Sequence, residues 1–233
     1  MHQTPLQEII DGFERKHGER NRCFLHQRGD ILLFLANARL RLGKQIRAGD
    51  TPKRELLASV GSVFSRTIAL ANSFGNLDIV SALCKKYPLS RCAYCGKKPC
   101  ECDVTKRNPI KEEVELSDAQ MKWSIWEWSR HLKKVYGAAN HERGIDYILG
   151  RLTEEFLEAS DEEFVAQYSF ITTSRELREK LAKEISDVFA WTFGLANELN
   201  VNLDGLARAW AFKKCEDCKK LPCECGPFRF ISS

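Results

Sequence analysis

The chain contains one cysteine pattern twice, and this repetition constrains its fold more than any other feature. The pattern C-x2-C-x4-C-x-C, ending in Pro-Cys-Glu-Cys, occupies residues 92–102 and again residues 215–225. Four thiolates so close together suit the tetrahedral shell of structural zinc. We expect one zinc ion in each cluster, and an iron–sulfur cluster is the main alternative because cysteine spacing alone does not exclude it. The expected ligands are Cys92, Cys95, Cys100 and Cys102 in the first cluster and Cys215, Cys218, Cys223 and Cys225 in the second.

The sequence upstream of the two clusters repeats as well. Val63-Phe64 recurs as Val188-Phe189, and a Leu-Ala-Asn follows each pair at the same distance. Self-similarity at a fixed period indicates tandem units. The predicted division is a first unit at residues 1–103, a linker at 104–115, a second unit at 116–226 and a tail at 227–233.

Apolar residues recur with the period of an α-helix, and the alternation typical of strands is almost absent. We therefore predict an all-α protein in which two tandem four-helix units form a pseudo-dimeric helical bundle. Each unit is followed by a small four-cysteine zinc knuckle. Helices are expected near residues 4–17, 27–47, 53–74 and 77–86 in the first unit and near 117–136, 143–164, 174–200 and 203–213 in the second. Ser117-Asp118 and Thr173-Ser174 are predicted N-caps, and Gly137 is a predicted helix stop.

The composition is that of a soluble globular protein, with 43% apolar and 29% charged residues. We find no apolar stretch of about 18 residues and no secretory leader, so we expect a cytoplasmic protein without a membrane partner. The charge is uneven, because residues 1–112 carry 20 Lys+Arg and 11 Asp+Glu, and the remainder carries 16 and 21. A basic half is weak evidence for a nucleic-acid partner, which we do not favour.

Acidic residues at helical spacing mark the second unit. On the helix expected at 174–200, Glu184 falls inside the apolar stripe and Asp187 lies at its border. An ionised carboxylate buried without compensation is costly, so Glu184 needs a counter-charge. Glu155 and Glu158 share one face of the preceding helix. Because oxygen ligands suit Mg²⁺ or Mn²⁺, we predict such a site on these four residues, and a solvated acidic face is the alternative.

The order EExxE, then about 25 residues, ExxD and Leu-Ala-Asn resembles the MazG-like all-α NTP pyrophosphatase superfamily over residues 117–214. The resemblance implies that acids on two packed helices bind Mg²⁺, which activates water and holds a nucleoside triphosphate. The catalytic residues it implies are Glu154, Glu155, Glu158, Glu184 and Asp187, with Glu154 as general base or additional ligand. The substrate-binding residues it implies are Asn197, Lys213 and Lys214, and Trp123 or Trp126 for stacking on the nucleobase, although core packing is the favoured role of the tryptophans.

These residues predict a metal-dependent nucleoside-triphosphate pyrophosphohydrolase that cleaves (d)NTP to (d)NMP and pyrophosphate by metal-activated water. Such a reaction needs no side-chain nucleophile, and we see no Gly-rich phosphate loop and no defensible Ser–His–Asp set. The alternative is a zinc-stabilised helical binding module for nucleic acid or a protein partner, in which the acidic site is vestigial.

The first unit lacks the acids. Alignment through the repeated Val-Phe pair places Ser59 opposite Glu184 and Ser62 opposite Asp187. Members of the resembled superfamily complete their sites across dimers or tetramers, so the first unit is expected to brace the second, and association of two chains as a homodimer stays open. The basic residues that we consider as its phosphate ligands, with plain surface charge as the alternative, are Arg39, Arg41, Lys44 and Arg47.

Overall fold

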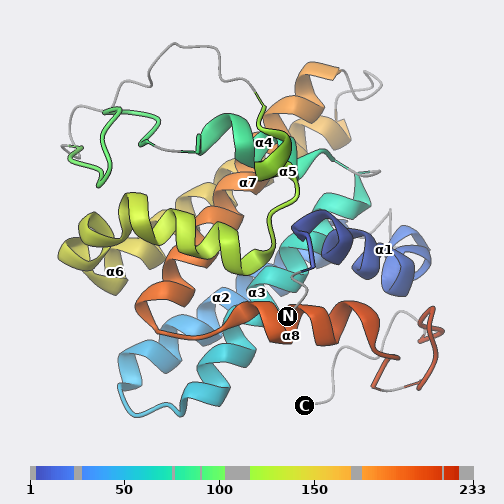
Figure 1. Cartoon of the computed structure of the whole chain (residues 1–233). Coiled ribbons are helices and arrows are strands. Elements are labelled where there is room, and N and C mark those ends of the chain that lie inside the picture. Colours follow the sequence, from blue (N-terminus) through green and yellow to red (C-terminus); the bar gives the residue numbers. More distant parts are fainter. Residues whose placement is uncertain are drawn as a thin grey trace.

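The computed structural model describes residues 4–23, 28–74, 77–89, 91–102, 116–168, 175–216 and 218–225. Within these ranges it is all-α, as predicted, and the only extended pairing is an isolated bridge between Pro5 and Ser124. No helix in the described part is long and apolar enough to cross a membrane. The helices are α1 (Leu6–Cys23), α2 (Arg28–Ala48), α3 (Lys53–Ser73), α4 (Ile79–Lys86), α5 (Asp118–Met121), α6 (Ile125–Tyr168), α7 (Arg175–Glu198) and α8 (Leu203–Phe212) (Figure 1).

The predicted helix at residues 117–136 is divided into α5 and the start of α6. Ser124 accounts for the division because its hydroxyl accepts a hydrogen bond from Glu127 N at 3.2 Å, and Glu127 Oε2 accepts one from Ser124 N at 2.8 Å. This reciprocal pair is a capping box, which starts a new helix at residue 125. Ser117 caps α5 in the predicted manner. The predicted linker at 104–115, the predicted cap at 173–174 and the tail at 227–233 lie outside the described residues.

The predicted helix stop at Gly137 is wrong. The helix continues through Gly137 to a kink at Gly144. Gly144 has φ 80° and ψ 168°, a conformation that only glycine adopts readily. The kink divides α6 into a first part that packs near α5 and a second part that carries the acids. It therefore sets the direction in which Glu155 and Glu158 approach α7.

Replacing Gly144 with alanine is expected to lower the free energy of unfolding by roughly 1–3 kcal/mol, the usual cost of a side chain in this region. An added Cβ would meet no atom within 4 Å, so the cost is conformational and not steric. Gly150 is the matched control, because it lies in the same helix and its Cβ would also meet nothing within 4 Å. Gly150→Ala should stabilise the helix by roughly 0.5–1 kcal/mol. Equal effects of both substitutions in urea unfolding would contradict this explanation.

The repeated Val-Phe pairs meet at the centre of the core. Phe64 on α3 and Phe189 on α7 are fully buried, and their rings stand edge to face with centroids 5.2 Å apart. Phe193 adds a third buried ring 5.9 Å from Phe64. Aromatic contacts of this geometry add to the stabilisation that burial alone supplies. The α3–α7 contact is therefore an aromatic junction between the two halves of the chain.

The last helix and the cysteine loop of each half pack against the other half. Helix α4 packs against α7, and α8 packs against α1 and α3. The cysteine loops follow the same rule: Cys100 N donates to Val135 O on α6 at 2.7 Å, and Cys223 N donates to Lys16 O on α1 at 2.8 Å. Figure 1 shows the two loops on opposite sides of the bundle. Each half thus places a helix end and a cysteine loop on the other half.

Candidate functional site

Three of the predicted acids come together between α6 and α7. Glu155 and Glu158 project from α6, Glu184 projects from α7, and one carboxylate oxygen of each lies within 4.8 Å of the others. Glu155 is only 4% exposed and Glu184 only 9%, whereas Glu158 is exposed. The helical spacing of the sequence thus produces a three-carboxylate group with two buried members and one open to solvent.

The negative charges in this group are only partly compensated by neighbouring side chains. Lys183 Nζ donates to Glu184 Oε1 at 2.7 Å, but Glu184 Oε2 is buried without a hydrogen-bond partner among the described residues. Partial desolvation by its neighbours and the nearby Glu155 and Glu184 raise the pKa of Glu158, although its side chain is open to solvent. Carboxylates in this situation need a further positive charge to remain ionised together. An oxygen-only donor set of this kind fits Mg²⁺ or Mn²⁺.

Glu155 is held in place by two donors. Arg151 Nη2 lies 2.7 Å from Glu155 Oε1, and Trp191 Nε1 donates to the same oxygen at 3.3 Å. Glu154 is exposed and forms an ion pair with Arg151, so the structure places it beside the three-glutamate group and not within it. The role of Glu154 as general base or additional ligand stays a prediction.

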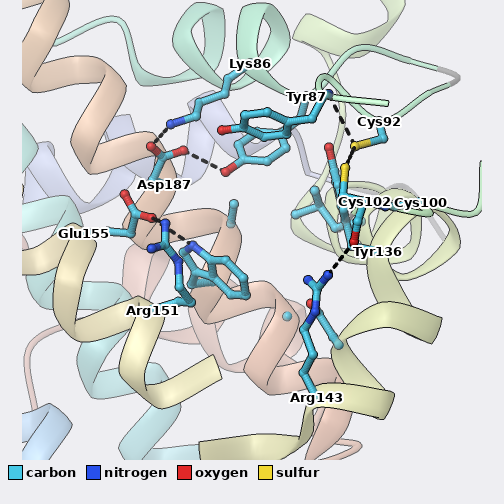
Figure 2. A pocket seen from close by; sticks show the side chains of 16 residues that line it. Lys86, Tyr87, Cys92, Cys100, Cys102, Tyr136, Arg143, Arg151, Glu155 and Asp187 are labelled. Atoms are coloured by element: carbon cyan, nitrogen blue, oxygen red, sulfur yellow. Dashed lines mark hydrogen bonds and ion pairs between the residues drawn. The ribbon is translucent and has the colours of Figure 1, made fainter. Parts of the chain in front are cut away.

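Asp187, the fourth predicted ligand, lies with a lysine instead of with the three glutamates. Lys86 Nζ forms an ion pair with Asp187 Oδ2, and Tyr87 OH donates to Asp187 Oδ1 at 2.7 Å (Figure 2). Asp187 is 1% exposed, so these two contacts replace its lost hydration. Lys86 and Tyr87 belong to the end of α4, in the first half of the chain. Sequence reasoning missed both residues.

Lys86 lies in an environment that disfavours its charge. Burial and the nearby Lys183 lower the pKa of Lys86 to about 8, although Glu155, Glu184 and Glu158 raise it. At neutral pH the amine still carries its proton for most of the time. Lys86 therefore adds a partly buried positive charge beside the three glutamates. It comes from the first half of the chain, which lacks the equivalent glutamates.

A cavity of about 60 Å³ adjoins the acids, and the first cysteine loop forms one of its walls. Glu155 and Asp187 lie on one side, and Cys92, Cys100 and Cys102 lie on the other (Figure 2). Arg143 Nη2 donates to Cys102 O at 3.0 Å, which ties the loop to α6. The wall also contains aromatic, amide and cationic side chains, namely Tyr87, Tyr136, Trp191, Asn140 and Arg151.

The predicted tryptophans lie away from this cavity's lining. Trp123 is partly buried and packs edge to face on Trp128, with ring centroids 5.2 Å apart. The His131 ring packs on both tryptophans, with its centroid 5.1 Å from that of Trp123 and 6.3 Å from that of Trp128. Trp126 is 42% exposed, and the guanidinium of Arg130 lies 5.0 Å from its ring centroid. These contacts fit the packing role that we favoured for Trp123.

The predicted polar substrate residues have other neighbours. Asn197 Nδ2 donates to Ser129 O at 2.9 Å, and Ser129 Oγ donates to Asn197 Oδ1 at 2.8 Å, so Asn197 ties α7 to α6. Lys213 and Lys214 are exposed and line a different cavity, beside Arg66. The structure therefore does not bring these three residues to the acids.

Each cysteine cluster has the geometry of a four-thiolate site. The Sγ atoms of Cys92 and Cys102 are 3.6 Å apart, and those of Cys215 and Cys225 are 3.7 Å apart. A tetrahedral zinc ion with Zn–S bonds of about 2.3 Å requires edges of about 3.8 Å. An iron–sulfur cluster divides its four thiolates between two or four irons and holds thiolates on different irons farther apart, whereas all four Sγ atoms of each cluster here lie within 4.8 Å of one another. The two clusters can therefore each bind one zinc ion.

Backbone amides support the thiolates in both loops. Glu101 N donates to Cys95 Sγ at 3.4 Å, and Glu224 N donates to Cys218 Sγ at 3.4 Å. Donors of this kind orient the sulfurs and stabilise their negative charge. The two loops are thus built in the same way, although only the first lines the cavity beside the acids.

Replacing Lys86 with methionine is expected to lower the free energy of unfolding by about 3 kcal/mol, because Asp187 would keep a buried charge without its cation. Asp187→Asn in the same chain should restore most of the loss. Lys85→Met is the control, since Lys85 is exposed on the preceding position. Urea unfolding of the single and double variants forms a double-mutant cycle. Additive effects would show that Lys86 does not stabilise the protein through Asp187.

Comparison with known proteins assigns the chain to no family. Protein-family models, curated proteins and solved structures give no match. The evidence for function is therefore the three-glutamate group, its buried surroundings and the cavity beside it.

Proposed function

We propose that the protein is a Mg²⁺- or Mn²⁺-dependent nucleoside-triphosphate pyrophosphohydrolase of the MazG-like type. The observation that carries this proposal is the environment of Glu184. Its carboxylate is buried, one oxygen has no hydrogen-bond partner among the described residues, and Glu155 and Glu158 lie within 4.8 Å. A divalent cation satisfies all three carboxylates at once, which no described side chain does.

Glu155, Glu158 and Glu184 would hold the metal. When bound, a divalent cation lowers the pKa of a coordinated water and neutralises charge on the transferring phosphoryl group. Arg151 and Trp191 fix Glu155 and so preserve the ligand geometry. Glu154, one position earlier on α6, is our candidate for the base that accepts the proton of the attacking water. Asp187 could join the ligands only if Lys86 left it.

The cavity beside the acids supports a nucleotide as the substrate. Its aromatic wall, from Tyr136 and Trp191, suits a nucleobase, and Lys86, Arg143 and Arg151 supply positive charge for phosphates. At about 60 Å³ it holds only part of a nucleotide. The base is therefore expected to enter the cavity and the triphosphate to lie at its mouth, between these cations and the exposed Glu158.

We further propose that the two halves act as a pseudo-dimer. The crossing of α4 to α7 and of α8 to α1 and α3 supports this arrangement. So does the equivalent docking of Cys100 on Val135 and of Cys223 on Lys16. In this arrangement the first half contributes Lys86 and Tyr87 to the site of the second half, as one protomer contributes to its partner in a dimer. Each cysteine cluster would bind structural zinc and hold its loop on the opposite half.

A panel of NTPs and dNTPs, incubated with Mg²⁺ or Mn²⁺, tests the proposed activity. We expect at least one nucleotide to yield pyrophosphate and the corresponding monophosphate in equal amounts, and no turnover without a divalent cation. Release of orthophosphate would place the cleavage at another bond and overturn the proposal. Absence of turnover, together with salt-sensitive binding of nucleic acid, would favour the zinc-stabilised binding module.

A further inference from the structure

A second and larger cavity lies at the opposite end of the repeat. Its volume is about 470 Å³, and α1, α3, α8 and the second cysteine loop enclose it. Four of its lining residues are lysine or arginine, and Glu216 is the only carboxylate among those described. The cavity is therefore strongly cationic. The four cations are Lys16, Arg66, Lys213 and Lys214.

This cationic cavity occupies the position in the first half that the acidic site occupies in the second. Alignment through the repeated Val-Phe pairs equates Arg66 with Trp191, and each lines its own cavity. Trp210 stands five positions before Cys215, as Tyr87 stands five before Cys92, and these four residues also line the respective cavities. The two cavities are thus equivalent surfaces of the two halves.

The carboxylates have been lost from the first half. On α2 the buried Leu35, Ala38 and Leu42 have the spacing of the buried Leu152, Glu155 and Ala159 on α6. This places Ala38 at the position of Glu155 and Arg41 at that of Glu158. Ser59 and Ser62 stand where Glu184 and Asp187 do. The first half therefore has no carboxylate set that could hold a divalent cation at this position.

Arg66 is a half-buried cation with no acidic partner among the described residues. Arg66 Nη1 donates to Ser62 O at 3.3 Å, and Arg66 Nε is buried without a hydrogen-bond partner among the described residues. Burial and the nearby Arg41 lower the pKa of Arg66. Lys16 Nζ donates to Trp210 O at 2.7 Å, so a second charge is fixed at the same wall. Such an arrangement is relieved by an anion that enters the cavity.

We propose that this cavity binds the di- or triphosphate group of a free pyrophosphate or of a nucleotide, and binds it without hydrolysis. Arginine and lysine are the side chains that recognise phosphate, and Arg66 offers a planar fork for two phosphate oxygens. Trp210 offers an aromatic surface for a nucleobase. Because Ala38, Arg41, Ser59 and Ser62 stand where the second half has Glu155, Glu158, Glu184 and Asp187, the cavity lacks the carboxylate set that would hold a catalytic cation. The first half is thus a ligand-binding site in its own right, independent of whether the second half hydrolyses nucleotides.

Titration calorimetry on the full chain in Mg²⁺-free buffer tests this assignment, with inorganic pyrophosphate and α,β-methylene-ATP as probes. We expect one site per chain, and at least tenfold weaker binding after Arg66→Gln. Lys213→Gln/Lys214→Gln should also weaken binding, and because both lysines are exposed this variant should fold normally. Equal affinity for the two probes would identify the phosphates as the recognised group, and tighter binding of the nucleotide that is lost in Trp210→Ala would add the base.

Two control variants test whether pyrophosphate binds in this cavity and not at the acidic site or elsewhere on the second cysteine loop. Glu155→Gln/Glu184→Gln should leave pyrophosphate binding unchanged. Lys219→Gln/Lys220→Gln alters two exposed lysines of the same loop that do not line the cavity, and should also have no effect. The proposal is wrong if the wild-type chain binds neither probe, or if binding survives the Lys213/Lys214 change. It is also wrong if only the acidic-site variant loses binding.

Discussion

Replacing Glu184 with glutamine is expected to reduce pyrophosphate release by roughly a thousandfold, equivalent to about 4 kcal/mol of transition-state stabilisation. The amide keeps the shape of the side chain but cannot neutralise a metal ion. The folded protein should tolerate the change, because it removes a buried charge from a group of three carboxylates. We expect the free energy of unfolding, measured without divalent cations, to stay the same or to rise by roughly 1 kcal/mol.

Glu179→Gln is the matched control for this variant. Glu179 lies on the same helix, is exposed and pairs with Arg175, so its loss should change neither turnover nor metal affinity. Glu155→Gln should behave like Glu184→Gln. If the folded Glu184→Gln variant retained full activity, the metal-ligand role of Glu184 would be refuted.

Removing one cysteine cluster at a time is expected to separate two roles of zinc. Cys92→Ala/Cys95→Ala and Cys215→Ala/Cys218→Ala should each lower the zinc content from two ions per chain to one. Each should also lower the free energy of unfolding by several kcal/mol, because zinc binding contributes directly to folding. Only the first pair should weaken substrate binding further, with KM raised roughly tenfold, because Cys92, Cys100 and Cys102 line the cavity beside Asp187.

Metal content by mass spectrometry, chemical denaturation and steady-state kinetics measure these effects together. Kinetics must be recorded at a temperature at which both variants remain folded. Iron in the purified protein, or an equal rise of KM in both variants, would contradict the assignment of the two loops. Full zinc content in either variant would show that the four thiolates are not the ligands.

Each helix's share of the three-glutamate group could be predicted from the sequence because helical periodicity determines it, whereas the packing of the two acidic helices against each other was implied by the family resemblance. Glu155 and Glu158 are three residues apart, and Glu184 interrupts an apolar stripe, so local spacing alone indicates which side chains share a face. The cysteine clusters are likewise local, since all four thiolates of each lie within one short loop. The glutamates on one helix and the thiolates of one cluster are thus each set by residues close together in the chain.

The partner of Asp187 could not be predicted in this way. Lys86 is 101 positions away, at the end of α4, and only the crossing of α4 onto α7 brings the two together. Helical periodicity carries no information about such a contact. The exposed Lys213 and Lys214 show the same limit, because they lie at the end of α8 and line the cavity of the other half. The sequence shows Lys86, Lys213 and Lys214, but only the packing of α4 and α8 determines which cavity each of them lines.

The predicted start of α6 and the predicted stop at Gly137 were wrong for a different reason. The Ser124–Glu127 capping box was present in the sequence and would have indicated the start of α6. Glycine often follows a helix, which makes Gly137 a reasonable but wrong prediction of the stop. The kink lies instead at Gly144, where the backbone has φ 80°. Helix α6 contains three glycines, Gly137, Gly144 and Gly150, and the sequence alone does not tell which one adopts the unusual conformation.

Anomalous diffraction from crystals grown with Mn²⁺ tests the metal site most directly. We predict a peak between α6 and α7, with oxygens of Glu155, Glu158 and Glu184 at about 2.1–2.2 Å, and with the Lys86–Asp187 ion pair intact. Glu184→Gln crystals grown in the same way should lack the peak. Full Mn²⁺ occupancy elsewhere with none at these glutamates would contradict the account.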